Sequence, residues 1–185
     1  MNIESLEKNI DKFHKATAHL AGAIIGVPAV GLREFPVVVK KEDELIVCGL
    51  GKLTDTDFIN PYVVNAAFSL ELSLKLLHYL DQKKWKGGHN LCNIYTPLSP
   101  ESKQQALEIF NNTVKNSERH SEIFKVMNEQ LGVSFSWDLT QLITKSSTAF
   151  EDWRYTFQTK KTTWFAGYPE IRFAVHQRIE QLKKC

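Results

Sequence analysis

Cysteine is scarce in this chain, and its three thiols form no recognisable framework. Cys48, Cys92 and Cys185 are odd in number, lie far apart and match neither a CxxC spacing nor a paired Cys/His spacing. A structural zinc site or a disulfide framework needs such spacing, so neither is expected. The sequence therefore predicts no metal site, and a reducing cytoplasm is the simplest compartment for it.

Long apolar runs are missing too. The longest extends from Leu20 to Leu32, and a proline and three glycines interrupt it. It is shorter than the roughly 20 residues that a membrane-spanning helix needs, so no membrane span is expected. Three acidic residues precede it, Glu4, Glu7 and Asp11, and they do not suit the basic leading segment of a signal peptide.

Charge of one sign is not in excess, because 23 Lys and Arg residues face 21 Asp and Glu residues, for a net charge of +2. This balance does not predict nucleic-acid binding over the whole surface, although it leaves room for a local basic patch. The P-loop, the dinucleotide-binding fingerprint, the nucleophile elbow and the metal-binding helix motif are absent as well. We therefore expect no cofactor.

What the chain does contain is enough apolar material for one globular domain. Its 185 residues are 43% hydrophobic, and eleven Phe and four Trp supply large core side chains. Apolar residues recur at helical spacing along most of it, between Gly, Pro and Ser-Pro signals that begin and end helices. The predicted fold is an all-α helical bundle over residues 1–185, with helices over Ile3–Gly26, Asn60–Asp81, Ser99–Asn116, Ser117–Leu131, Asp138–Phe157 and Glu170–Lys183.

One segment departs from the helical pattern. Pro36–Val39 and Leu45–Cys48 are rich in β-branched residues and flank a charged stretch, which predicts a small β-hairpin. An isolated hairpin is marginally stable in water, so this one is expected to lean on the helices. We expect residues 1–57 to form a helix-and-hairpin extension and residues 60–182 to form the bundle core.

The most informative segment is Asn65–Leu80, which lies within the helix predicted over Asn60–Asp81. Apolar side chains cover most of its circumference, as in a helix at the middle of a bundle. Glu71, Lys75 and His78 form a narrow polar notch on it, and Glu71 precedes Lys75 by four residues, the favourable order for an ion pair. Two interpretations remain open: a structural ion pair at the core edge, or a cleft-facing carboxylate with a tuned pKa.

The glycine turn Gly87–Asn90 is the second candidate segment. Its two glycines allow close approach of the backbone, and His89 or Asn90 can cap a short helix. His89 is therefore either a structural hydrogen-bonding residue or a functional one.

The third candidate segment is Phe150–Phe157. Its aromatic side chains face the core, whereas Arg154 lies at the margin, where a desolvated guanidinium needs a carboxylate or carbonyl partner. We expect Arg154 to pair with Glu71, with His89 adjacent to both.

Together these segments resemble the HEPN family of helical bundles. The resemblance covers roughly residues 60–182 and rests on three motifs in the expected order, Glu71-Leu-Ser-Leu-Lys75-Leu-Leu, Gly88-His89-Asn90-Leu91 and Trp153-Arg154-Tyr155. It implies an all-α bundle, often a homodimer, that binds nucleotides or RNA and works with a cognate antitoxin or nucleotidyltransferase. The binding residues that it suggests are Glu71, Lys75, His89, Arg154 and Tyr155.

The chain departs from the family at the catalytic motif. Ribonuclease members carry an Arg, then four to six residues, then a His, and no pair here has that spacing. Arg172 and His176 come closest, with three residues between them, which places both on one face of the last predicted helix. They are either part of a solvated polar stripe or, in a dimer groove, a catalytic pair.

A basic and aromatic patch completes the candidates. Lys83-Lys84-Trp85-Lys86 interleaves cations with an indole ring, a combination that can hold phosphate and stack a base. Exposed loops without a ligand have the same composition. We expect a dimeric, non-catalytic binding module in an RNA- or nucleotide-linked prokaryotic system of the toxin–antitoxin or defence type. The alternatives are a metal-independent ribonuclease using Arg172 and His176, and a purely structural interaction protein.

Overall fold

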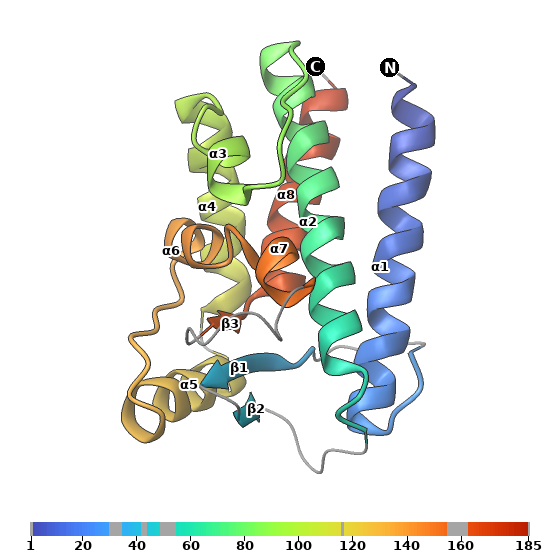
Figure 1. Cartoon of the computed structure of the whole chain (residues 1–185). Helices are drawn as coiled ribbons and strands as arrows, with labels where there is room; N and C mark the ends of the chain where they lie inside the picture. Colours follow the sequence, from blue (N-terminus) through green and yellow to red (C-terminus); the bar gives the residue numbers. More distant parts are fainter. Residues whose placement is uncertain are drawn as a thin grey trace.

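The computed structural model describes residues 2–29, 35–41, 44–48, 55–115, 117–154 and 163–184 (Figure 1). These residues are mostly helical and include one small antiparallel sheet, so the main feature of the predicted class, an all-α bundle, is confirmed. Helix α1 (Ile3–Ile25) matches its prediction. It begins where the Asn2 side chain accepts from the Ser5 backbone N–H, and it ends at Gly26, whose positive φ of 69° suits glycine.

Helix α2 (Ile59–Gln82) is the central helix of the bundle and packs against α1 and α8 (Tyr168–Lys183). Its buried residues cover most of its circumference, as the sequence predicts. The helix begins at Ile59, one residue before its predicted start at Asn60, and the preceding Phe58 makes no side-chain cap bond. Pro61 still lies in the first turn, where its missing N–H costs nothing.

Three shorter helices follow α2. Asn90 caps α3 (Leu91–Tyr95), and its side chain accepts from the Asn93 backbone N–H. Ser99 caps α4 (Pro100–Val114), as predicted, and α5 (Glu118–Lys125) runs into a π-helical turn, η1 (Val126–Gln130).

The single long helix predicted from Asp138 is wrong. The chain instead forms α6 (Leu139–Lys145) and α7 (Ala149–Arg154). The break between them leaves the Ser147 carbonyl free to accept a hydrogen bond from the Leu91 backbone N–H, at 3.1 Å. A continuous helix would direct that carbonyl along its own axis, so the break satisfies the first turn of α3.

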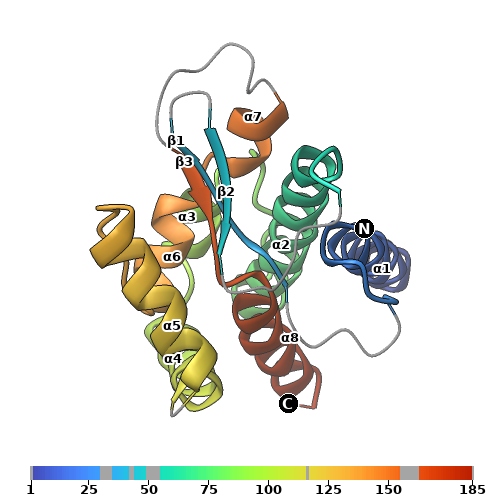
Figure 2. The ribbon, with the colours of Figure 1, turned by 90° about the horizontal axis from the view of Figure 1, so that it is seen from below.

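The predicted hairpin is present as β1 (Val37–Lys41) and β2 (Glu44–Cys48). A third strand, β3 (Thr163–Phe165), was not predicted, and it pairs with the other edge of β1 to give the order β2-β1-β3. Val38 therefore lies opposite both Val47 and Phe165. The sheet crosses the lower end of the bundle (Figure 2).

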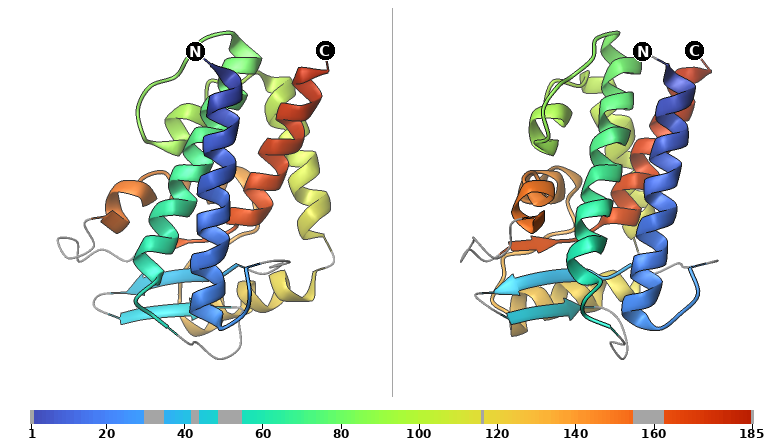
Figure 3. Two further views of the ribbon diagram at one scale, coloured as in Figure 1. Left: turned by 90° about the vertical axis from the view of Figure 1, so that its right-hand side faces the viewer. Right: turned by 45° about the vertical axis from the view of Figure 1, so that its right-hand side comes forward.

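The four longest helices, α1, α2, α4 and α8, run along one another, with the sheet below them (Figure 3). Within the described ranges, no helix is both long and apolar enough to cross a lipid bilayer. Cys48 and Cys92 are free thiols, as expected, and Cys185 lies outside the described residues.

Candidate functional site

Glu71 and Lys75 form a buried ion pair on α2. Lys75 Nζ lies 2.7 Å from Glu71 Oε1, and the two side chains are only 10% and 1% exposed. Their four-residue spacing places them one helical turn apart, as the sequence indicates. Because both charges are buried away from water, removal of either side chain would leave the other with an uncompensated buried charge.

His89 joins this pair from the glycine turn. Its Nδ1 lies 3.0 Å from Glu71 Oε2 and 3.1 Å from Oε1, so the predicted contact of His89 with Glu71 is confirmed. One face of the imidazole stacks on the Phe150 ring, at 5.5 Å between centroids. Half of the His89 side chain, 51%, stays exposed. The buried carboxylate therefore fixes the orientation of a ring that solvent can reach.

Arg154 reaches the cluster by a different route from the one expected. The oxygens of Glu71 are held by Lys75 and His89, whereas the exposed Arg154 places its guanidinium 5.2 Å from the centroid of Phe150. Arg154 lies at the C-terminal end of α7, and Lys75 lies one turn from Glu71 on the same helix. The nearer cation takes the carboxylate, and Arg154 makes a cation–π contact.

Trp85 covers the outer side of the ion pair. Lys75 Nζ lies 5.8 Å from the centroid of its ring, yet the residue is 47% exposed. The neighbouring Lys84 is exposed, and its backbone carbonyl lies 2.9 Å from Nδ1 of His78. His78 is therefore a buried anchor for this turn and not part of an open polar notch.

An open cavity of about 410 Å³ adjoins the glycine turn. Its lining runs through the turn and the start of α3: Lys86, Gly87, Gly88, His89, Asn90, Asn93, Thr96 and Pro97. No atom lies within 4 Å of the position that a Cβ would take at Gly87 or Gly88, so backbone faces open space there. The surface formed by Trp85, Lys84, Lys86, His89 and this cavity is hereafter the Trp85 surface.

The remaining predicted residues do not join the Trp85 surface. Tyr155 lies outside the described residues. Arg172 and His176 share one face of α8, as predicted, and line a separate cavity of about 320 Å³ on the α1 side of the bundle. The structure therefore brings together five of the residues that the sequence suggested: Glu71, Lys75, His89, Lys84 and Trp85. Arg154 is linked to them through Phe150.

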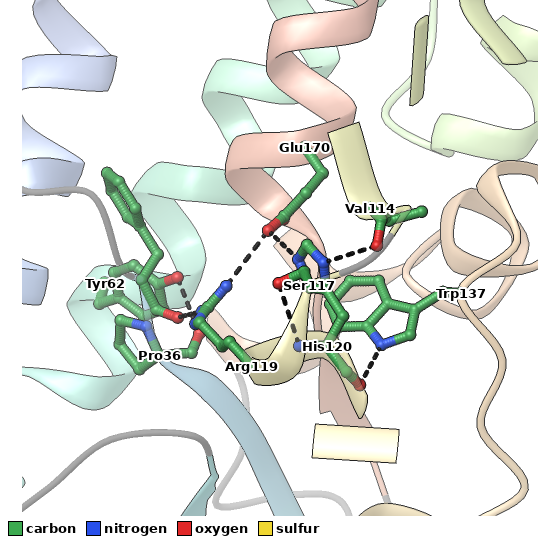
Figure 4. Close-up of polar contacts among 9 residues, drawn as sticks. Pro36, Tyr62, Val114, Ser117, Arg119, His120, Trp137 and Glu170 are labelled. Atoms are coloured by element: carbon green, nitrogen blue, oxygen red, sulfur yellow. Dashed lines mark hydrogen bonds and ion pairs between the residues drawn. The ribbon is translucent and has the colours of Figure 1, made fainter. Parts of the chain in front are cut away.

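A second buried polar cluster was not predicted. Glu170 Oε1 lies 2.8 Å from Nε2 of His120 and 3.2 Å from Nη1 of Arg119 (Figure 4). The side chains of Glu170 and His120 are 6% and 9% exposed, and that of Arg119 is 16% exposed. The cluster joins the first turn of α8 to the first turn of α5.

The same cluster anchors the start of β1. Arg119 Nη2 donates to the Phe35 carbonyl at 2.6 Å, and the Tyr62 hydroxyl donates to the Pro36 carbonyl at 3.0 Å (Figure 4). Burial raises the pKa of Tyr62 well above its ordinary value, so this hydroxyl keeps its proton. These bonds satisfy carbonyls that precede the sheet, and the burial of the cluster suits a structural role.

A third polar cluster links the ends of α2 and α4 with α8. The Ser99 and Ser102 hydroxyls donate to Asp81 Oδ1, at 2.7 and 2.5 Å, and Arg178 Nε donates to Ser102 Oγ at 3.1 Å. Burial alone would raise the pKa of Asp81, but the hydrogen bonds from Ser102 and Ser99 lower it to about 2. Asp81 is therefore an ionised structural anchor.

In the part of the chain that the structure describes, no group of three His, Cys, Asp or Glu side chains is placed to hold a metal ion. The Trp85 surface offers an exposed aromatic face, nearby ammonium groups and an imidazole held by a buried carboxylate, which are features that bind ligands. Comparison of the chain with family models, with curated proteins and with solved structures found no match in any of the three.

Proposed function

We propose that this chain is a non-catalytic binding module for single-stranded RNA or a nucleotide, and that its Trp85 surface holds the ligand. The observation that carries this proposal is the position of Trp85. Its ring is 47% exposed, with exposed lysines on its side of the glycine turn and the ammonium of Lys75 at 5.8 Å. An exposed indole among cations can stack a base while the cations hold phosphate.

His89 and the glycine turn provide the second half of such a site. Glu71 holds Nδ1 of His89, so the rest of the half-exposed ring has a fixed direction from which to meet a ligand. The adjoining cavity of about 410 Å³ is lined by polar side chains and bare backbone at Gly87 and Gly88. A phosphate or ribose can approach that backbone closely because no Cβ stands in the way.

The wider setting follows from the family resemblance. The motifs Glu71-Leu-Ser-Leu-Lys75, Gly88-His89-Asn90-Leu91 and Trp153-Arg154-Tyr155 resemble those of HEPN proteins, and the first two contact each other through Glu71 and His89. We propose a homodimer in a toxin–antitoxin or defence system, with an antitoxin or a nucleotidyltransferase as its partner. Such a chain would work in the cytoplasm, without a cofactor.

Binding of a short fluorescein-labelled single-stranded RNA, followed by anisotropy, tests the proposed site. Trp85→Ala should weaken binding at least about fivefold, because stacking on an aromatic side chain contributes about 1–3 kcal/mol per base. Trp85→Phe should keep most of the affinity. Lys84→Ala should weaken binding about two- to fivefold. It should also make the slope of log affinity against log salt concentration shallower by about one.

Lys12→Ala on α1 is the matched control, because Lys12 is also exposed but lies on a helix, whereas Lys84 lies in the turn after α2. It should leave the affinity and the salt dependence unchanged. Equal weakening by Lys12→Ala and Lys84→Ala would show that RNA meets only the general charge of the protein. Undiminished binding by Trp85→Ala would place the ligand elsewhere.

The second candidate function is a metal-independent ribonuclease, because Arg172 and His176 do share one cavity. Their spacing differs from the ribonuclease motif, so we expect no cleavage of single-stranded RNA in the presence of EDTA. Gel electrophoresis of the products checks this. Cleavage that disappears in His176→Ala, at an unchanged unfolding midpoint, would replace the binding module with the ribonuclease.

A further inference from the structure

Three aromatic rings stack in a column that leads from α2 to the surface at the glycine turn. The centroid of Phe150 lies 5.3 Å from that of Phe68 and 5.5 Å from that of His89, and the ring planes are inclined by only 29° and 24°. The column lies on the α3 and α7 side of α2, away from α1 (Figures 1 and 2). Phe68 and Phe150 are partly buried, whereas the His89 side chain is 51% exposed, so the column ends in solvent at His89.

His89 presents an open face at the end of this column. Phe150 covers one face of the imidazole, and the Glu71 carboxylate holds its Nδ1 edge at 3.0 Å. The exposed half of the side chain therefore includes the opposite face and the Nε2 edge. Because a buried carboxylate and a packed ring fix the plane of the imidazole, that face is held in place before a ligand arrives. Nucleobases stack on aromatic side chains of this kind, histidine included.

Trp85 offers a second exposed ring close to the first. Three contacts in series join the two rings: the Trp85 centroid lies 5.8 Å from Lys75 Nζ, this Nζ lies 2.7 Å from Glu71 Oε1, and that oxygen lies 3.1 Å from His89 Nδ1. The buried ion pair of Lys75 with Glu71 therefore links two rings that are each about half exposed, at 47% and 51%. A lone nucleotide has one base and would cover only one of them, whereas a single strand can cover both.

The charges near the two rings favour phosphate on the side of the glycine turn. The segment Lys83–Pro100 contains three lysines and no acidic residue, and Glu101, the next acid, forms an ion pair with α8. Lys103 adds an ammonium group from α4, because its Nζ donates to the Thr96 carbonyl at 3.2 Å and Thr96 lines the cavity of about 410 Å³. Helix α7 instead carries two acids in its first turn, before Arg154. A phosphate backbone is therefore favoured along the turn and the cavity and disfavoured over α7.

We infer that the Trp85 surface binds a single strand through two bases, one stacked on Trp85 and the other on the open face of His89. The backbone between these bases passes along the cavity, near Lys86 and Lys103. This inference rests on the proposed function and narrows its ligand to an oligonucleotide of at least two nucleotides. Stacking on a ring face does not depend on the identity of the base, so the site accepts strands of different sequence.

Competition against the fluorescein-labelled RNA tests how many bases the surface holds. One competitor is the 5′-phosphorylated adenosine dinucleotide, which has two bases. The other is adenosine 3′,5′-bisphosphate, which has one base and more negative charge. The dinucleotide should bind at least about fivefold more tightly, because the second base stacks on its own ring.

Variants of His89 show whether that ring is the second one. In His89→Ala the advantage of the dinucleotide over the bisphosphate should fall below about twofold, whereas in His89→Phe, which keeps a flat ring against Phe150, most of it should remain. His19→Ala on α1 is the matched control, because His19 is an exposed histidine on a different part of the protein. The advantage should be the same in this variant as in the wild type.

The comparison of the two competitors needs no variant, so it decides the matter even where a variant fails to fold. Equal competition by the two compounds would refute the two-base site, and so would an advantage that survives in a folded His89→Ala. In both cases, binding of the labelled RNA that still weakens in Trp85→Ala leaves the proposed function in place. Binding that does not depend on Trp85 would instead remove the proposed function, and the two-base site with it.

Discussion

Glu71→Leu should lower the free energy of unfolding by about 3–5 kcal/mol, as expected when one partner of a buried ion pair is removed. The substitution removes the carboxylate that balances the charge of Lys75, whose side chain is only 10% exposed. His89 loses the same partner, but its side chain is half exposed and water can replace the bond. Urea unfolding followed by circular dichroism measures the change.

The double variant Glu71→Leu with Lys75→Met separates this cause from a simple packing defect. An apolar pair of similar volume often replaces a buried ion pair at little cost, so the second change should recover most of the lost stability. Glu151→Gln on the exposed face of α7 is the control and should change stability by less than about 0.5 kcal/mol. Additive losses in the double variant would show that Lys75 does not depend on Glu71.

Glu170→Ala should lower the free energy of unfolding by a similar amount, about 3–5 kcal/mol, because a different buried cluster loses its carboxylate. Glu170 holds Arg119 and His120 together, and Arg119 in turn holds the Phe35 carbonyl. Removing the carboxylate leaves a largely buried guanidinium unbalanced and loosens the contact of α5 with both α8 and β1. The variant should unfold at a clearly lower urea concentration than the wild type.

A local probe distinguishes this loosening from general destabilisation. The Trp137 indole N–H donates to the His120 carbonyl at 2.7 Å. The centroids of the Trp137 ring and the His120 imidazole lie 4.2 Å apart. In Glu170→Ala, hydrogen exchange at this indole should speed up more than exchange in α1. Glu122→Gln on the exposed side of α5 should change neither quantity. Uniform acceleration over the whole chain would argue against a local anchor.

The parts of the site that could be predicted are those whose residues lie close together in sequence. Glu71 and Lys75 are one turn apart on a strongly apolar helix, so their pairing follows from helical geometry. His89 reaches Glu71 because α2 ends at Gln82 and the glycine turn brings the chain back toward Glu71. The exposure of Trp85 likewise follows from its position among lysines just beyond the helix end.

The parts that could not be predicted depend on contacts between distant segments. Glu170 finds its partners some fifty residues earlier, and nothing in the spacing of Arg119 and His120 indicates a carboxylate there. The Glu71 carboxylate is held by Lys75 and His89 rather than by Arg154, and the sequence did not predict the break between α6 and α7 that the Leu91–Ser147 hydrogen bond uses. β3 is only three residues long, too short for a periodic signal.

The strand order β2-β1-β3 has a consequence for how the chain assembles. β1 is the middle strand, with Val37, Val38 and Val39 all buried, and its first partner follows immediately in sequence. Its second partner is Thr163–Phe165, so that edge of an apolar strand stays open until most of the chain has emerged from the ribosome. Pairing over so long a loop is slow to form. The interval before β3 arrives is therefore when the nascent chain is most exposed to aggregation, and when a chaperone bound to that edge would help most.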